Sequence, residues 1–343
     1  MMRYRLLGNS GLRVSELAYG IMNFGTQAWG TPDADACAGL YHAYREAGGN
    51  FIDTANEIYA GGRSEQFLGQ LIAGHRDEVV VGSKFSFHLP GTANANIAGN
   101  HRKSMMRSVE ASLKRLGTDF IDVLWVHGWD TLTPVDEMMR GLDDLVRQGK
   151  VHYVGISNAP AWVVAQANTM AELRNWTRFA GLQLEYSLLE RDVEHELLPM
   201  ARALGLAVLA YSPLASGILS GKYNVPADAG TRRLDINTFM ASADERALDV
   251  AAAVVALARE LGHTPSQVAL AWLRAQPCVI PIIGARTLAQ LQDNLGCLDL
   301  ALTADQVALL SAVSVQRTPY PQRFIERTRF ISSGGFYDKI DRS

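Results

Sequence analysis

Hydrophobic and polar positions divide the chain into short apolar runs that alternate with longer amphipathic stretches. The apolar runs predict eight buried strands, at residues 17–20, 50–53, 79–84, 120–127, 151–157, 179–185, 207–211 and 278–282. Several are continuously apolar, such as VVVG and AVLAY, as expected of strands that are buried on both faces. Between the strands, apolar residues recur at helical spacing, as in residues 34–47, 102–116, 134–147 and 246–261.

Local signals mark the ends of several predicted helices. Gly48-Gly49 ends the first of them, because glycine readily adopts the left-handed conformation found after a helix. Thr133 precedes Pro134, which predicts a threonine cap with proline in the first turn. The segment Ser242-Ala-Asp-Glu245 predicts a capping box that opens the helix at 246–261.

The order of these elements predicts the fold. Strands and helices in strict alternation indicate a parallel sheet with helices outside it. Eight strands, and no G-x-G-x-x-G after the first, favour a closed (β/α)8 TIM barrel over an open, dinucleotide-binding sheet. We therefore expect one α/β domain over residues 1–343. It would carry an N-terminal β-hairpin at about 4–17, an insertion at about 217–240, and a C-terminal tail at about 315–343 over the barrel mouth or rim.

Composition narrows the class of protein. A chain of 343 residues suits one barrel with insertions, and 48% hydrophobic with 20% charged residues is typical of a soluble protein. A net charge of −3 gives no reason to expect a nucleic-acid partner. No run approaches the ~18 apolar residues of a membrane span, and the N-terminus lacks the apolar core of a signal peptide. Three cysteines without CxxC spacing fit a cytoplasmic protein in which they are core or helix-face residues, and no metal site is expected.

Four side chains suggest chemistry. Asp53, Lys84 and His127 each close a predicted strand, and Tyr59 follows shortly after Asp53. In a barrel, the carboxyl ends of the strands converge on one mouth. Taken singly, Asp53 could be a helix cap and Lys84 a solvated strand end. His127 could be a structural histidine, and Tyr59 a surface aromatic. Together they favour catalysis, because a lysine beside an aspartate can lower the pKa of a tyrosine that protonates a carbonyl oxygen.

Seven segments carry a resemblance to a known family. They are FIDTA…YAGGRSE, VGSKF, LWVHGWD, VGISN, LQLEYSLLER, YSPLASGILSGKY and PIIGARTLAQLQDN. In order and spacing they resemble those of aldo-keto reductases over essentially the whole chain, above all the long bacterial and potassium-channel-β-like members. The resemblance implies a tetrad in which Tyr59 donates a proton, Lys84 stabilises its phenolate, Asp53 holds Lys84, and His127 orients the carbonyl. Tyr59 lies six positions after Asp53 instead of the family's five, so we expect a one-residue insertion at about 56–58.

The resemblance also implies a cofactor site, and side chains on the loops after the predicted strands suggest a substrate pocket beside it. The nicotinamide half would contact Gly20, Met22, Ser157, Asn158, Gln183 and Tyr211. The phosphates and adenosine would contact Ser212, Leu214, Gly217, Lys222, Gly284, Arg286, Gln290, Asp293 and Asn294. A guanidinium such as that of Arg286 binds a phosphate group through two hydrogen bonds. Because NADP(H) carries a 2′-phosphate that NAD(H) lacks, Arg286 favours NADP(H), while NAD(H) stays possible. Trp29, Asn56, Phe87 and Trp129 are the expected substrate contacts.

These observations predict a cytoplasmic, NADPH-dependent reductase of a small-molecule aldehyde or ketone. The alternative is a redox-sensing regulatory subunit that binds the cofactor and turns over slowly. A Schiff-base aldolase would also place a lysine at a strand end, but it does not account for Tyr59, Asn158 or Arg286. A short-chain dehydrogenase is excluded because no tyrosine is followed four residues later by lysine. The physiological substrate, the direction of reaction and the oligomeric state are not predicted.

Overall fold

Eight parallel strands form a closed barrel in the computed structural model, which describes residues 1–26, 30–31, 33–89, 91, 93–224 and 243–341. The strands run in the order β10-β3-β4-β5-β6-β7-β8-β9 around the barrel. Their bounds are β3 Ala18–Gly20, β4 Phe51–Asp53, β5 Val80–Phe85, β6 Ile121–Val126, β7 Val151–Ser157, β8 Phe179–Glu185, β9 Ala207–Tyr211 and β10 Val279–Ile283. The predicted TIM barrel and the predicted strands are confirmed.

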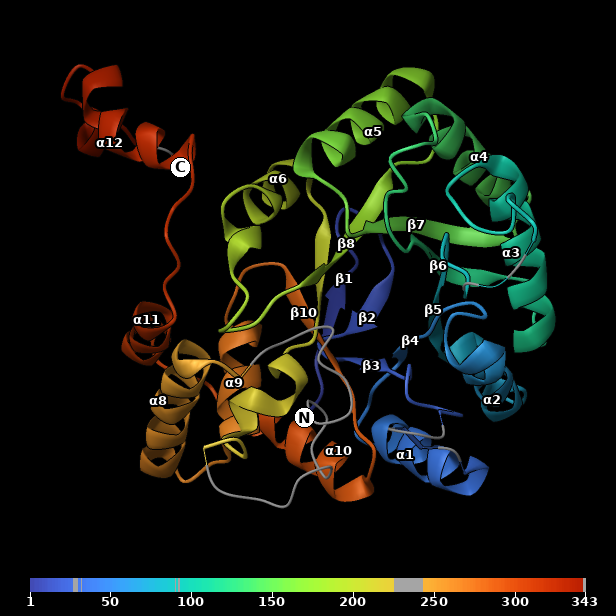
Figure 1. Ribbon diagram of the computed structural model, residues 1–343, viewed down its shortest axis with the longest axis horizontal. Helices are drawn as coiled ribbons and strands as arrows, with labels where there is room; N and C mark the ends of the chain where they lie inside the picture. The colour runs from blue at the N-terminus through green and yellow to red at the C-terminus, as the bar shows by residue number, and fades with distance from the viewer. Residues whose placement is uncertain (27–29, 32, 90, 92, 225–242, 342–343) are drawn as a thin grey trace.

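Helices surround the barrel (Figure 1). The α-helices are α1 Ala34–Glu46, α2 Arg63–Ile72, α3 Arg102–Leu116, α4 Val135–Arg147, α5 Ala161–Arg174, α6 Leu197–Leu204, α8 Glu245–Leu261, α9 Pro265–Arg274, α10 Leu288–Leu295, α11 Ala304–Val313 and α12 Gln322–Ser332. Short 3-10 helices are η1 Ala60–Gly62, η2 Arg76–Glu78, η3 Asp192–Glu194, η4 Ala215–Ser220, η5 Gly296–Asp299 and η6 Tyr337–Lys339.

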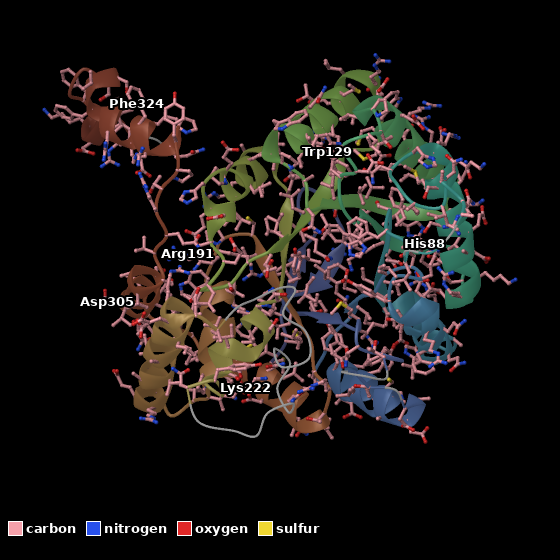
Figure 2. All side chains as sticks on the ribbon, viewed as in Figure 1. His88, Trp129, Arg191, Lys222, Asp305 and Phe324 are labelled. Atoms are coloured by element: carbon pink, nitrogen blue, oxygen red, sulfur yellow. The ribbon has the colours of Figure 1, made fainter. Side chains whose placement is uncertain are left out.

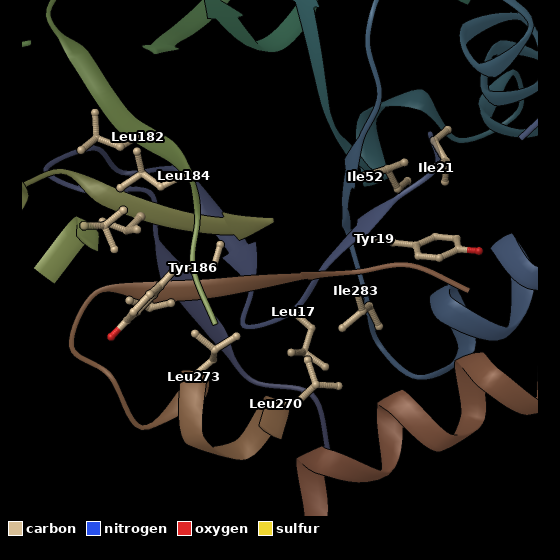
Figure 3. Packing of buried hydrophobic residues seen from close by; sticks show 14 of the residues in the cluster. Leu17, Tyr19, Ile21, Ile52, Leu182, Leu184, Tyr186, Leu270, Leu273 and Ile283 are labelled. Atoms are coloured by element: carbon tan, nitrogen blue, oxygen red, sulfur yellow. The ribbon is translucent and has the colours of Figure 1, made fainter. Parts of the chain in front are cut away.

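The main hydrophobic core lies between the outer face of the barrel and the ring of helices. Figure 3 shows part of it, where Leu270 and Leu273 of α9 lie close to Leu17 and Tyr186. All four are buried. Outward-facing strand residues thus pack against the apolar sides of the helices, which explains why the strands are apolar on both faces.

A second apolar cluster fills the inside of the barrel. Trp125 lies at its centre, and a Cβ atom added to Gly155 or Gly181 would come within 2.2 or 3.2 Å of the Trp125 ring. Glycines on the next two strands, β7 and β8, therefore make room for this large side chain. The hairpin of β1 (Tyr4–Leu6) and β2 (Arg13–Ser15) adds Leu7 and Val14 to the cluster. The hairpin closes the amino-terminal end, which leaves the carboxyl end for chemistry.

Two predicted helix caps are wrong. The N-cap of α4 is Pro134, and the Thr133 hydroxyl donates to Asp130 Oδ2 at 2.7 Å instead. Helix α8 begins at Glu245, and its cap is Asp244, whose carboxylate accepts a hydrogen bond from the backbone of Ala247. In both cases a carboxylate two or three positions away from the predicted cap serves as the acceptor.

The C-terminal tail does not lie over the barrel mouth. After α11 the chain leaves the barrel, and α12 stands apart from it (Figure 1). Figure 2 shows Phe324 on this outlying helix, where its side chain is 60% exposed, and no residue of α12 is buried. The expectation that the tail covers the mouth is therefore wrong for this structure.

The three cysteines do not form disulfides with one another. Cys37 and Cys297 are buried and Cys278 is half-buried, and all three are free thiols. Among the helices of the described residues, none combines the length and the apolar character that crossing a membrane requires.

Candidate active site

Strand alternation brings the polar side chains into the carboxyl end of the barrel. Trp125 faces the interior, and successive residues of a strand point to opposite faces. His127 directly follows β6 and stands two positions after Trp125, and its backbone N–H still pairs with the Phe85 carbonyl of β5, so it faces inward one layer above Trp125. Asp53 stands two positions after the interior Phe51, and Lys84 is paired with Trp125 in the β5–β6 register. The four predicted catalytic residues gather around this layer.

A buried ion pair joins Asp53 and Lys84. The Lys84 side chain is 1% exposed, and its ammonium donates to Asp53 Oδ2 and, at 2.7 Å, to the carbonyl oxygen of Thr54. The other carboxylate oxygen of Asp53 accepts a 2.9 Å hydrogen bond from Gln183 Nε2. The aspartate thus has a partner on each oxygen, and the lysine cannot turn away from the site.

Tyr59 lies over this pair. It belongs to the loop after β4, and its ring centroid is 5.3 Å from Lys84 Nζ. Burial raises the pKa of the Tyr59 phenol above its usual value, while the Lys84 charge opposes that rise. The prediction that Lys84 lowers the tyrosine pKa therefore describes one contribution that burial outweighs. A phenol in this setting holds its proton at neutral pH.

Lys84 remains a cation in this setting. Burial lowers the pKa of the Lys84 ammonium, but Asp53 and Tyr59 raise it by more, so that it stands above its usual value. A charged ammonium can stabilise a phenolate that forms beside it.

His127 completes the group as a neutral ring. Burial and the nearby Lys84 hold the pKa of His127 well below its usual value. Its ring packs edge-on against Tyr59, with centroids 5.8 Å apart, and lies 4.5 Å from the Phe87 ring. Its Nδ1 atom is buried without a hydrogen-bond partner among the described residues. A neutral imidazole has one N–H group, which can donate to an oxygen placed between His127 and Tyr59.

The residues expected at the nicotinamide lie beside this tetrad. Tyr211 donates a 2.9 Å hydrogen bond to Asn158 Oδ1, and Asn158 Nδ2 donates to the carbonyl oxygen of His127 at 2.9 Å. The Ser157 hydroxyl is buried, and it has no partner within the described part of the chain. Buried polar atoms normally have partners, so this orphaned hydroxyl fits a ligand that supplies one. Gln183, by contrast, uses its amide nitrogen on Asp53.

Two further residues close this side of the site. Gly20 ends β3 and is paired with Asp53, and a Cβ atom there would lie 2.7 Å from Ile282 Cγ2. A larger residue at position 20 would therefore clash with the neighbouring strand. Met22 follows and is half-buried.

The segment after β9 has the backbone geometry of an anion cradle. Ser212, Ser216 and Gly217 have φ values of 52°, 57° and 90°, in the left-handed region. Ala215, with a φ of 45°, makes three consecutive left-handed residues with Ser216 and Gly217. Successive backbone N–H groups in such a turn can point toward one anion. A Cβ atom on Gly217 would lie 2.5 Å from Lys222 Nζ, so glycine lets the lysine approach the turn. Figure 2 shows Lys222 in this region, and Leu214 precedes η4 as its N-cap.

The loop after β10 presents Arg286. Its backbone N–H donates to Gln290 Oε1 at 2.9 Å, and Asn294 Nδ2 donates to the Gly284 carbonyl oxygen at 3.1 Å. Gln290 and Asn294 therefore shape the loop. Asp293 Oδ1 accepts a 2.7 Å hydrogen bond from Thr264, which ties Asp293 to the start of α9. The half-buried Arg286 side chain has no ion-pair partner in the described residues, which fits an anionic ligand.

Not every predicted substrate residue faces the site. Trp29 lies outside the described residues. Asn56 is 2% exposed; its amide donates to the Phe87 carbonyl and the Ser108 hydroxyl, and its oxygen accepts from the Ile58 backbone. In this structure the Asn56 side chain therefore holds the loop, and its role as a substrate contact stays a prediction.

Aromatic side chains line the mouth. Phe87 is 42% exposed and packs on His127, and Trp129 is half-buried with its indole N–H unpaired among described residues (Figure 2). Trp162, in the first turn of α5, meets Trp129 edge-on at 5.4 Å and is 59% exposed. Sequence reasoning missed Trp162 because it stands inside a helix pattern; its place four residues after Asn158 was the available signal. Among the described residues no group of histidine, cysteine and acidic side chains is arranged to hold a metal.

Comparison with known proteins decides the family. The model of the aldo/keto reductase family matches residues 16–315, which includes every strand of the barrel. The chain belongs to the aldo/keto reductase family. It is an oxidoreductase, as the names of its curated relatives also indicate.

Three fungal relatives illustrate the similarity. The aldo-keto reductase ausK of Aspergillus calidoustus is 40% identical over 326 residues, covering 91% of this chain and 82% of that protein. The norsolorinic acid reductase stcV of Emericella nidulans is 38% identical, covering 92% and 82%. An aryl-alcohol dehydrogenase [NADP(+)] of Phanerodontia chrysosporium is 35% identical, covering 90% and 85%.

Proposed function

We propose that this aldo/keto reductase reduces an aryl aldehyde or ketone with NADPH, and that Tyr59 is the proton donor. One observation carries the proposal: Tyr59, His127 and the Lys84–Asp53 pair converge on one point above the packed interior of the barrel. When bound, NADPH supplies the hydride, because no side chain can do so. The residues of the chain supply orientation and the proton.

Tyr59 acts as the general acid. Its raised pKa keeps the phenol protonated at neutral pH, which is the form that a reduction needs. As the proton leaves, negative charge develops on the phenol oxygen and Lys84 stabilises it. Asp53 holds the ammonium in place and, through its bond to Gln183, is itself held by β8. Alcohol oxidation is the reverse, with the Tyr59 phenolate as base.

His127 orients the carbonyl. A neutral ring donates one hydrogen bond without competing with Tyr59 as an acid, and its depressed pKa keeps it neutral. The carbonyl oxygen would lie between the Tyr59 hydroxyl and the imidazole N–H, the two groups that meet at the mouth.

The residues present fit a dinucleotide with a 2′-phosphate. The unpaired hydroxyl of Ser157 and the Asn158 amide would hold the carboxamide, and Tyr211 would support the ring. The turn at 212–217 with Lys222 would receive the pyrophosphate, and Arg286 the 2′-phosphate. The relative named for NADP(+) supports the same preference.

The aromatic mouth favours an aryl substrate. Phe87, Trp129 and Trp162 present ring faces and edges that pack well against another aromatic ring. The unpaired Trp129 indole N–H can additionally donate to a polar substituent. Relatives named for aryl alcohols and for norsolorinic acid support this class.

A substrate panel tests the proposal. NADPH oxidation is followed with paired aromatic and aliphatic aldehydes, and with NADH as the alternative cofactor. We expect higher kcat/KM for the aromatic members, and Trp129→Leu should lower it for these while leaving the aliphatic values within about twofold. Equal values for both series would contradict the aryl assignment. NADPH binding without turnover on any member would contradict the reductase assignment and favour a cofactor sensor.

A further inference from the structure

The loop that carries Tyr59 is anchored by a charged cluster that none of the proposed chemical steps uses. The cluster joins the carboxylates of Glu57 and Glu65 to Arg107, Arg115 and His88. Glu57 lies in the segment where the chain has one residue more between Asp53 and Tyr59 than the family spacing. It therefore stands two positions before the proposed acid.

Glu57 is held by three side chains from outside its loop. Its Oε1 accepts from Arg107 Nη2 at 3.0 Å and contacts His88 Nδ1 at 3.1 Å, and its Oε2 accepts from Arg115 Nη2 at 3.3 Å. Arg107 and Arg115 both belong to α3, and His88 follows β5; Figure 2 shows His88 on this side of the barrel. The Glu57 side chain is 15% exposed, so water competes weakly for these contacts.

Arg115 connects the loop to the strand that carries Lys84. Its Nε donates to Glu65 Oε2 at 2.7 Å, and Glu65 Oε1 accepts from the Ser83 hydroxyl at 2.6 Å. Ser83 immediately precedes Lys84. A continuous chain of contacts therefore runs from Glu57, two positions from Tyr59, to the neighbour of Lys84.

The backbone of the loop requires such support. Ala60 has a φ of 52° and Gly62 a φ of 90°, so the turn directly after Tyr59 is left-handed at both positions. The stem of Arg115 packs on Gly62, where a Cβ atom would lie 2.7 Å from Arg115 Cδ. The left-handed alanine costs free energy that its surroundings must offset. Arg115 both fills the space over this turn and links the two carboxylates.

Opposite charges face each other in the cluster. Burial raises the pKa of the Glu65 carboxyl, and the Arg115 charge and the hydrogen bond from Ser83 oppose that rise. Burial raises the pKa of Glu57, but its own backbone N–H, Arg107 and Arg115 lower it by more, so the carboxylate stays ionised. Two carboxylates face two guanidinium groups, and all four side chains are buried or half-buried. Removing one member would leave a partly buried charge without its partner.

We infer that Glu57 and Arg115 are positioning residues that hold the Tyr59 loop against β5 and so set the distance between the Tyr59 phenol and the Lys84 ammonium. Neither side chain touches the reacting atoms. The inference rests on the proposed role of Tyr59 as proton donor. It explains how a loop with one extra residue still presents its tyrosine to Lys84.

Glu57→Gln tests the inference in the full-length protein, because it removes the charge and keeps the shape. We expect kcat for carbonyl reduction to fall roughly 10- to 100-fold, the range for a displaced catalytic group, while the Kd for NADPH stays within about twofold. The solvent deuterium isotope effect on kcat should rise, because proton transfer from a displaced Tyr59 becomes slower. Amide hydrogen exchange should accelerate at residues 54–62 and stay unchanged in β5.

Two further variants separate positioning from stability. Glu57→Asp keeps the charge and should recover part of kcat. Glu110→Gln, on the outer face of α3 where Glu110 pairs with Lys150, is the matched control and should leave kcat and the isotope effect unchanged. Arg115→Lys keeps the charge but loses the bridge between the two carboxylates, and should resemble Glu57→Gln.

The outcomes divide clearly. Wild-type kcat, isotope effect and exchange in Glu57→Gln would overturn the inference while leaving the reductase assignment intact. The inference would also be overturned if kcat fell only in proportion to the fraction of folded protein and the isotope effect did not change. If the wild-type protein has no reductase activity, or if Tyr59→Phe is as active as wild type, the proposed function fails and the inference fails with it.

Discussion

Replacing Lys84 with methionine tests the electrostatic core of the site. Methionine fills a similar volume but carries no charge, so the phenolate of Tyr59 loses the cation beside it. In the structure, Lys84 Nζ lies 5.3 Å from the Tyr59 ring centroid. At an effective dielectric constant of about 20, two unit charges separated by about this distance attract each other by about 3 kcal/mol.

The rate effect follows from how far the proton has moved in the transition state. If half of the negative charge has developed, kcat should fall about 10-fold; if all of it has, about 200-fold. The variant also removes the partner of Asp53, and breaking a buried ion pair costs about 3–5 kcal/mol of unfolding free energy. Burial already raises the pKa of Asp53, so the carboxyl can take up a proton and reduce that cost.

A double-mutant cycle separates the two effects. Unfolding free energies and kcat at saturating NADPH are measured for Lys84→Met, Asp53→Asn and the double variant. The double variant should be less destabilised than the sum of the single ones by about 0.5–3 kcal/mol, because no unpaired charge remains, yet its kcat should stay low. A Lys84→Met enzyme with kcat within threefold of wild type would refute the assignment of Lys84 as the stabilising cation.

Three further predictions concern cofactor choice and pH. Arg286→Ala should weaken NADPH binding by about 1.5–3 kcal/mol, which raises the KM for NADPH roughly 10- to 150-fold, and should leave the KM for NADH unchanged. Equal changes in both KM values would contradict the role of Arg286 at the 2′-phosphate. Because the pKa of His127 is depressed and that of Tyr59 is raised, kcat for reduction should be constant from about pH 6 to about pH 9; a step near pH 6.5 that vanishes in His127→Gln would contradict the neutral ring. Glu16, held by Arg3 and Arg274, has its pKa lowered to about 2, so its stabilising contribution is present above the unfolded-state pKa and lost as pH falls toward 2. Urea unfolding should therefore show a smaller loss of stability from pH 5 to 2 in Glu16→Gln than in wild type.

Much of the barrel could be predicted because strand burial leaves a simple signal. A strand covered on both faces is apolar over most of its length, and polar residues are found mainly near its ends. Asp53, Lys84 and His127 are therefore visible in the sequence as ionisable side chains at the ends of apolar runs. Their convergence follows from the parallel arrangement of strands and needs no knowledge of side-chain contacts.

Other features depend on competition that one sequence does not reveal. Asn56 has the polarity of a substrate contact, but the carbonyl of Phe87 and the hydroxyl of Ser108 reach it first. The balance between burial and the Lys84 charge at Tyr59 likewise depends on how deeply the phenol is covered. The sequence made Thr133 a plausible helix cap, but in the structure its hydroxyl donates a hydrogen bond to Asp130 instead. Each case is a choice between partners that only the folded chain brings together.

The tail shows a different limit. Its aromatic residues suggested a segment that covers the mouth, since aromatic side chains are usually buried. In the structure, Phe324 and Phe330 of α12 are 60% and 59% exposed, and the helix stands away from the barrel (Figure 1). Apolar content indicates that a segment can be buried, but it does not indicate where.

The most direct test of the central claim compares Tyr59→Phe with wild type in NADPH-dependent reduction of an aryl aldehyde. The change removes one hydroxyl and keeps the ring that packs against His127. We predict that kcat falls at least 100-fold, within the range for loss of a general acid, and that the Kd for NADPH changes less than twofold. Tyr59→Phe with wild-type turnover would show that the proton comes from another group, and the assignment of the active site would have to be abandoned.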